Sequence, residues 1–384
     1  MIDAKTRIVY DGTIFTSQSS GGISRYFRRL IEEAAQIRPE WLFDLHILDD
    51  GHAPAQLPSG RNIRITKRKY LRPGWCCLPL NYASRQCKIR DARPTIVHTT
   101  LARPLYYAPC PLVTTIHDTI IEKFPEFYSD KGYDRSKRWW RWSAQRAQAV
   151  FTVSNTSRAD ILDTWSTAPS RVHVTYPGVE EEFKRPAPVE ISALRASLGI
   201  GRRYILYVGH RSEHKNFQVL AQAIRSSNLE GLDLVLAGGA DAVPELDGWP
   251  GLQRNRLHHL QRVSDQQLGS LYAGAAALVF PSLYEGFGFP LVEAMSCGTP
   301  VVASDIPSSR EVCGDAAEFF PPRDAAGCEQ AILRVQEGER RSQLIRRGSE
   351  RARLFTWSSC AAQTVRVYEE VMAMQSQDAR RQVA

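Results

Sequence analysis

The sequence of 384 residues has no run of about 18 uncharged apolar residues, the length that would span a bilayer. Its first residues lack the apolar stretch and small-residue cleavage site of a signal peptide, so we expect a cytoplasmic protein. The 8 cysteines are scattered, and no pair has the C-x-x-C spacing of a zinc or redox site. We therefore expect reduced thiols.

Several catalytic motifs are also missing. There is no G-x-G-x-x-G run, which argues against a nicotinamide or flavin enzyme. There is no Walker A loop, no H-E-x-x-H pair and no G-x-S-x-G elbow. These absences disfavour P-loop nucleotide hydrolases, zinc proteases and serine hydrolases.

What the sequence does have is positive charge. The formal net charge of +8 favours an anionic partner, which leaves nucleic acid, an acidic membrane surface and a phosphorylated ligand open. Composition by itself does not choose among the three.

Short apolar runs alternate with segments of helical spacing, which is typical of βαβ units and a parallel sheet. The expected strands are 7–10, 43–48, 62–66, 95–98, 112–116, 149–153, 172–175, 204–208, 232–237, 257–260, 278–280, 300–303 and 318–320. A charged, proline-bearing stretch from Glu180 to Pro188 has the composition of a linker. We predict domains over 1–182 and 183–360, with 361–384 as a helix packing back on the first; the helical pattern itself begins near Arg353.

In open parallel sheets ligands bind where the strands end, so the loops after the strands are the places to search. In the first half these loops hold Gly21 and Gly22, which open a helix, and the pair His117 and Asp118. Backbone amides at a helix start bind anions, although two glycines equally permit a tight turn. A single His-Asp pair is more often structural than catalytic.

The second half holds the more specific loops. Gly209 leads a loop in which Arg211 and Lys215 suit a diphosphate, although a solvated basic loop is the plain alternative. The segment from Pro281 to Ala294 places a carboxylate after a strand, then glycines, then a second carboxylate in a helix. Carboxylates bind hydroxyls and amides bind phosphate, and a nucleotide sugar offers both.

These residues resemble the retaining family-four glycosyltransferases of GT-B architecture. Glu285 and Glu293 resemble that family's paired-glutamate motif, and Gly209 to Asn216 resembles its phosphate-binding loop. The stretches Ser20 to Phe27 and Ile116 to Asp118 resemble a branch of mannosyltransferase-like enzymes of bacterial polysaccharide assembly. The resemblance implies an α/β fold of two Rossmann-like parallel-sheet domains facing across a cleft.

The resemblance also implies roles for named residues. The expected catalytic residues are His117, Asp118, Arg211, Lys215 and Glu285. The expected donor-binding residues are Gly21, Gly22, Gly209, Arg262, Val263, Gly286, Phe287, Gly288, Phe289, Leu291 and Glu293. Glu285 would contact the donor sugar, Glu293 the ribose, and Lys215 with Arg211 the departing diphosphate. This loop reads Gly-His-Arg instead of the commoner Gly-Arg, so Arg211 is shifted by one position.

We expect a hexose, favoured as mannose from GDP-mannose, to move with retention onto a saccharide or polyprenyl-linked acceptor in lipopolysaccharide, O-antigen or exopolysaccharide assembly. No metal or other cofactor is expected, because the loops supply positive charge and no Asp-x-Asp motif follows a strand. Tryptophans at 139, 140 and 142 among cations suggest contact with anionic lipid at the inner face of the plasma membrane; packing onto the sheet is the alternative.

Other functions remain open at this point. An epimerase or phosphorylase on the same two-domain plan would process the donor without a saccharide acceptor. A non-catalytic binder of anions or nucleic acid would also explain the charge, but such a protein should carry a basic stripe with stacking aromatics. The cations here gather in loops after strands, so we expect no nucleic-acid partner.

Overall fold

The computed structural model describes residues 6–17, 21–49, 56–69, 78–102, 105, 108–128, 131–239, 242–253 and 255–383. Contacts divide the chain into two compact units. Unit 1 comprises Met1–Gly178 with Thr356–Ala384, and unit 2 comprises Val179–Phe355. These divisions fall a few residues before the expected borders after 182 and 360.

The described residues of unit 1 contain a seven-stranded sheet in the order β3-β2-β1-β4-β5-β6-β7, and every pairing is parallel. Its strands are β1 Arg7–Tyr10, β2 Leu42–Asp49, β3 Ile63–Lys69, β4 Ile96–Thr99, β5 Leu112–Thr115, β6 Ala149–Thr152 and β7 Val172–Val174. Its helices are α1 Thr13–Ser17, α2 Gly22–Ile37, α3 Leu78–Asp91, α4 Ile120–Lys123, α5 Lys131–Arg146, α6 Asn155–Trp165 and α15 Trp357–Val383. The expected strands of this half are confirmed.

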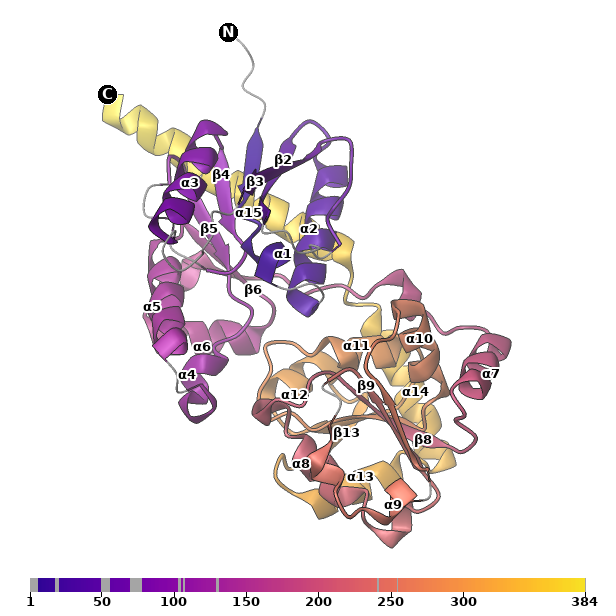
Figure 1. Ribbon diagram of the computed structural model, residues 1–384. Coiled ribbons are helices and arrows are strands. Elements are labelled where there is room, and N and C mark those ends of the chain that lie inside the picture. Colours follow the sequence, from indigo (N-terminus) through magenta and orange to yellow (C-terminus); the bar gives the residue numbers. More distant parts are fainter. Residues whose placement is uncertain are drawn as a thin grey trace. The chain divides into compact units, whose positions relative to one another are not determined.

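Unit 2 repeats the plan with a six-stranded parallel sheet among its described residues, in the order β10-β9-β8-β11-β12-β13. Its strands are β8 Tyr204–Val208, β9 Asp233–Ala237, β10 Leu257–Leu260, β11 Ala277–Phe280, β12 Val301–Ser304 and β13 Ala317–Phe320. Its helices are α7 Pro188–Ser197, α8 Phe217–Ala223, α9 Pro250–Gln253, α10 Asp265–Gly274, α11 Phe289–Ser296, α12 Pro307–Cys313, α13 Ala325–Arg334 and α14 Gly338–Ala352. Two doubly wound parallel sheets confirm the α/β, Rossmann-like expectation (Figure 1).

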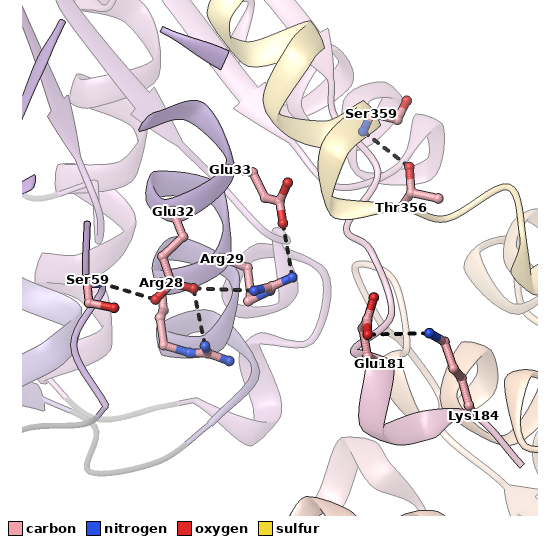
Figure 2. Close-up of polar contacts among 9 residues, drawn as sticks. All are labelled: Arg28, Arg29, Glu32, Glu33, Ser59, Glu181, Lys184, Thr356 and Ser359. Atoms are coloured by element: carbon pink, nitrogen blue, oxygen red, sulfur yellow. Dashed lines mark hydrogen bonds and ion pairs between the residues drawn. The ribbon is translucent and has the colours of Figure 1, made fainter. Parts of the chain in front are cut away.

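Helix α2 follows its apolar spacing. Phe27, Leu30, Ile31 and Ala34 are fully buried on one face. The other face carries ion pairs, with Arg28 and Arg29 both contacting Glu32, at 3.3 and 3.4 Å (Figure 2). The amphipathic pattern therefore fixes which side of the helix meets the sheet.

The chain returns to unit 1 through α15, which begins at Trp357 and not near Arg353 as the helical pattern predicted. The amide of Ser359 donates to Thr356 Oγ1 at 3.2 Å, which satisfies one amide of the first turn (Figure 2). Within unit 1, α15 packs beside α2 (Figure 1). The Tyr368 hydroxyl contacts Tyr10 Oη at 2.9 Å and His98 Nδ1 at 2.6 Å, so a buried polar network anchors the helix.

The stretch predicted as a linker is partly a core segment. Glu181–Phe183 forms a 3₁₀ turn, with Glu181 and Lys184 paired at its surface (Figure 2). The Phe183 ring is fully buried in unit 2 and meets Tyr272 at 5.9 Å between ring centroids. The charged residues and prolines of this stretch predicted a linker, but the buried ring of Phe183 anchors it to unit 2.

Helix α5 packs two of its three tryptophans onto buried clusters of unit 1. Trp140 packs against the buried cluster around Ile161, and Trp142 against the cluster around Val97. Trp139 is half-buried and lies under the guanidinium of Arg135 at 5.2 Å. Among the described residues no helix is both long and apolar enough to span a bilayer.

Candidate active site

The strongest sequence segment supplies an ion pair at the carboxyl end of the unit 2 sheet. Glu285 follows β11, and its Oε1 lies 2.6 Å from Lys215 Nζ. The hydroxyl of Ser282 donates to the same oxygen at 2.7 Å. The Lys215 and Glu285 side chains are 24% and 13% exposed, so the pair is partly shielded from water yet reachable. One carboxylate oxygen is thereby oriented, as a hydroxyl-binding group requires.

Asn216 joins the loops that carry this pair. It adopts the left-handed conformation at φ 52°, which asparagine tolerates better than most residues. Its Nδ2 donates to the carbonyls of Pro281 and Pro322, at 2.9 and 2.5 Å. The amide of Leu283 also donates to the His214 carbonyl at 2.8 Å. These hydrogen bonds fix the loop after β8 to the loop after β11, and Lys215 therefore lies beside Glu285.

Arg211 has surroundings of its own in the same loop. Its Nη2 donates to the Ala242 carbonyl at 2.6 Å, and its guanidinium lies 5.8 Å from the Phe217 ring centroid. A Cβ on Gly239, in the turn after β9, would lie 2.7 Å from Arg211 Nη1. Gly209 begins the loop at φ 125°, a conformation that side chains avoid. The expected partnership of Arg211 with Lys215 on one diphosphate stays a prediction.

The glycine-rich turn after Glu285 leads into α11, and Gly286 is buried within it. Gly288 has φ 98°, a conformation that favours glycine, and a Cβ there would also lie 2.9 Å from Leu291 Cδ1. The Leu291 amide donates to the Gly288 carbonyl at 3.0 Å within the first turn. That amide has an acceptor inside the helix, which weakens its expected role toward a phosphate.

Two aromatic residues of the same turn pack against each other. Phe287 is 4% exposed and contacts Phe289 and Phe355 edge to face, at 5.6 and 5.4 Å between ring centroids. Such edge-to-face pairs add to the free energy gained by burying the rings. The side chains of Phe287 and Phe289 therefore hold the turn in place, which leaves their backbone amides as the groups expected to bind the donor.

The second carboxylate, Glu293, lies inside α11 and is 4% exposed. Its Oε2 accepts a hydrogen bond from the Tyr272 hydroxyl at 2.8 Å. The paired-glutamate segment therefore combines one reachable acid, Glu285, with one buried acid, Glu293. Arg262 is exposed and Val263 half-buried in the loop between β10 and α10, where Ser264 and Gln267 form the predicted capping box.

The remaining predicted residues belong to unit 1. Gly21 and Gly22 are exposed at the start of α2, where the sequence placed them, whereas Ser20 of the same stretch lies outside the described residues. His117 packs its ring edge to face against Tyr26 at 5.0 Å, and its Nε2 is buried without a hydrogen-bond partner among the described residues. Burial lowers the pKa of His117 to about 3, so the ring is neutral at physiological pH. Asp118 Oδ1 accepts from the amide of Ile120, the first residue of α4, at 3.1 Å.

The pKa of His214, the residue before Lys215, is also shifted from its usual value. Burial lowers the pKa of His214, and the charge of Lys215 adds to this, although Glu285 opposes it. Within the described ranges, no group of three or more His, Cys, Asp or Glu side chains is placed to hold a metal ion.

Three residues that position the site were not singled out from the sequence. Ser282 lies three positions before Glu285, a spacing from which a hydroxyl can reach a nearby side chain. Asn216 directly before a helix is a local signal for a left-handed residue. Tyr272 has no such signal, because only the packing of α10 against α11 brings its hydroxyl to Glu293.

Comparison with known proteins adds the family. The profile described as "Glycosyl transferases group 1" matches residues 191–351, and the profile "Glycosyltransferase Family 4" matches residues 20–183. An O-antigen chain mannosyltransferase B of Escherichia coli is 31% identical over 299 residues, which cover 73% of this chain and 76% of that protein. The chain belongs to the group 1, family 4 glycosyltransferases.

Further relatives and folds are similar to this glycosyltransferase. An MMP alpha-(1->4)-mannosyltransferase of Mycolicibacterium hassiacum is 30% identical over 68% of this chain and 66% of that protein. A sucrose-phosphate synthase of Thermosynechococcus elongatus has a TM-score of 0.79 at 21% identity, over 96% of this chain and 100% of the other. HepE of Anabaena, solved with UDP-glucose, has a TM-score of 0.72 at 20% identity, over 95% and 99%. The fold of the glycosyltransferase is therefore GT-B.

Proposed function

We propose that this glycosyltransferase moves mannose from GDP-mannose, with retention at the anomeric carbon, onto a saccharide or polyprenyl-linked saccharide during cell-surface polysaccharide assembly. The mannosyltransferase names of the relatives from Escherichia coli and Mycolicibacterium hassiacum support the sugar. The identity of the donor and the stereochemistry rest on the family resemblance.

The observation that carries the proposal is the contact of Lys215 with Glu285 beside Ser282. The proposal assigns Glu285 to the hydroxyls of the donor sugar and Lys215 to the diphosphate. Donor binding would insert phosphate oxygens near the ammonium, which is a point charge suited to them. Glu285 would then bind the sugar, and Lys215 the diphosphate, on the two sides of the bond that breaks.

Departure of the nucleotide diphosphate concentrates negative charge on its oxygens. A fixed cation there stabilises the transition state more than the ground state, and each tenfold in rate requires about 1.4 kcal/mol. We propose that Lys215, with Arg211 and amides of the segment 286–289, supplies this charge without a metal ion. Activity lost on adding EDTA and restored by manganese would contradict the metal-free part.

Two measurements test the donor and the stereochemistry. Thermal shift with GDP-mannose, UDP-glucose and the free nucleotides should give the largest stabilisation with GDP-mannose, since only the folded state binds the ligand. NMR of the product should show an α-linked mannose, the configuration of the donor. An equal response to UDP-glucose would overturn the choice of nucleotide, and a β-linked product would overturn retention.

The acceptor side of the proposal concerns the membrane. With Trp140 and Trp142 packed on the core, contact with anionic lipid would rest on exposed cations of α5 such as Arg138 and Arg141. Such contact is electrostatic and should vanish at high salt. Flotation with phosphatidylglycerol vesicles at low salt tests it, with neutral phosphatidylcholine vesicles as the control.

Within the same fold, an epimerase or phosphorylase would consume the nucleotide sugar without a saccharide acceptor. Product analysis with donor alone, and with donor plus phosphate, separates these activities from transfer. The family match favours transfer.

A further inference from the structure

A second charged cluster lies in unit 1, at the carboxyl end of its sheet and outside the residues assigned above. Asp11 directly follows β1, Arg68 lies near the end of β3, and Thr100 directly follows β4. Asn81 and Arg85 lie one turn apart in α3. This is the edge where parallel α/β sheets bind ligands.

Both carboxylate oxygens of Asp11 already have hydrogen-bond donors. Its Oδ2 lies 2.5 Å from Arg85 Nη2. Its Oδ1 accepts from the amide and hydroxyl of Thr100, at 2.9 and 2.6 Å, and from the Thr13 amide at 3.3 Å. Burial alone would raise the pKa of Asp11, but the charge of Arg85 and these hydrogen bonds outweigh it and lower the pKa. The carboxylate is therefore ionised and committed to Arg85.

Arg68 has no such counter-ion. It is 9% exposed, and among the described residues no carboxylate lies within ion-pair distance of it. Its Nη1 donates to the Asn81 carbonyl at 3.0 Å, while its Nε is buried without a hydrogen-bond partner in that same part of the chain. Burial and the charge of Arg85 lower the pKa of Arg68 to about 10, although Asp11 opposes the shift. The guanidinium is still charged at neutral pH.

Burying an unpaired cation costs several kcal/mol, so natural proteins seldom keep one without a partner. Among the described residues, Arg68 and Arg85 bring two positive charges beside the one carboxylate of Asp11, and Asp11 is paired with Arg85, so Arg68 has no carboxylate of its own there. Guanidinium groups present planar forks that match the oxygens of a phosphoryl group, and they bind it through charge-assisted hydrogen bonds.

We propose that Arg68, beside the pair Arg85 and Asp11, forms a binding site on unit 1 for a phosphoryl group. The donor's diphosphate is assigned to loops of unit 2, so this second phosphoryl group comes either from free phosphate or from a phosphate carried by the acceptor. The choice of an acceptor phosphate rests on the proposed function, whereas binding of the anion does not.

Calorimetric titration of the full-length protein with inorganic phosphate tests the site. The background is Lys215→Ala, which removes one of the unit 2 cations that could bind phosphate; Arg211 is the same in every variant compared, so any difference between the variants comes from unit 1. In this background Arg68→Gln should weaken phosphate binding at least about tenfold, the loss of one charge-assisted hydrogen bond. The matched control is Arg64→Gln, an exposed arginine on the same strand, which should leave the affinity unchanged. Equal affinity in both variants, or no phosphate binding in the background protein, overturns the proposal.

Folding of the variant is checked by its melting temperature against that of Arg64→Gln, because Arg68→Gln also removes the buried hydrogen bond from Arg68 to the Asn81 carbonyl. If Arg68→Gln does unfold, Arg68→Lys takes its place, since it keeps the charge but loses the fork. That variant must then bind phosphate at least about threefold more weakly.

Geranyl diphosphate and pyrophosphate distinguish the two sources. Tighter binding of geranyl diphosphate, lost in Arg68→Gln, assigns the site to an esterified phosphate; equal binding assigns it to the free anion. GDP-mannose binding is measured on the wild type and on Arg68→Gln and should be the same in both. If the wild type does not bind GDP-mannose, the proposed donor is wrong, but the proposed phosphoryl site is unaffected.

Discussion

Replacing Lys215 with alanine should slow sugar transfer far more than it destabilises the fold. The ammonium lies 2.6 Å from Glu285 in a partly buried pair, whereas Ser282 keeps its own hydrogen bond to the same carboxylate oxygen. We therefore expect a stability loss of only about 1 kcal/mol, the upper range for partly exposed pairs. Loss of one charge-stabilising group in a transition state costs about 2.7–4 kcal/mol, so turnover should fall roughly 10²- to 10³-fold.

The assay is release of nucleotide diphosphate at saturating donor and acceptor, with urea unfolding measured in parallel. Lys184→Ala is the matched control, because Lys184 is 73% exposed in a surface pair with Glu181. This variant should retain full activity. Combining Lys215→Ala with Glu285→Gln separates two roles. If Lys215 only orients Glu285, its removal adds nothing in the Glu285→Gln background; if it also neutralises the diphosphate, turnover still falls there at least about tenfold. Turnover of the single variant within about threefold of wild type would refute the assignment.

Three further predictions concern stability in unit 1. Gly12→Ala should lower the free energy of unfolding by about 1–3 kcal/mol, because its φ is 58° and a Cβ would lie 2.3 Å from the His46 carbonyl oxygen; Gly201→Ala, with open space around it, is the control in thermal melts. Tyr368→Phe should cost about 1–3 kcal/mol in urea unfolding, since Tyr10 and His98 lose a buried partner; an unchanged midpoint would contradict the network. Burial lowers the pKa of His98 from 6.5 to about 3, so the unfolded state binds the extra proton and stability is lost as pH falls from 6.5 toward 3, by about 2 kcal/mol at pH 5. Urea unfolding at pH 7.5 and 5 checks this. His98→Asn should reduce the slope of the unfolding free energy against pH by the equivalent of about one proton.

Much of the fold follows from local pattern. The strands were predictable because parallel strands buried on both faces are continuous apolar runs, as in Tyr204–Val208, whose first residues are fully buried. The start of α10 was predictable because the Ser264 cap and Gln267 lie within one turn. The start of α15 was not, since Arg353 and Leu354 fit a helical pattern but the chain turns before Thr356 caps the helix.

The sequence by itself determined the two parallel sheets, the loops that carry chemistry and the family, because these depend on residues close together in the chain. Only the tertiary structure decided which side chains meet. Lys215 and Glu285 are far apart in sequence, and β8 and β11 must pair before their loops can touch. Likewise the burial of Arg68 beside Arg85 and Asp11 depends on three separate elements packing together, and no spacing in the sequence encodes that contact.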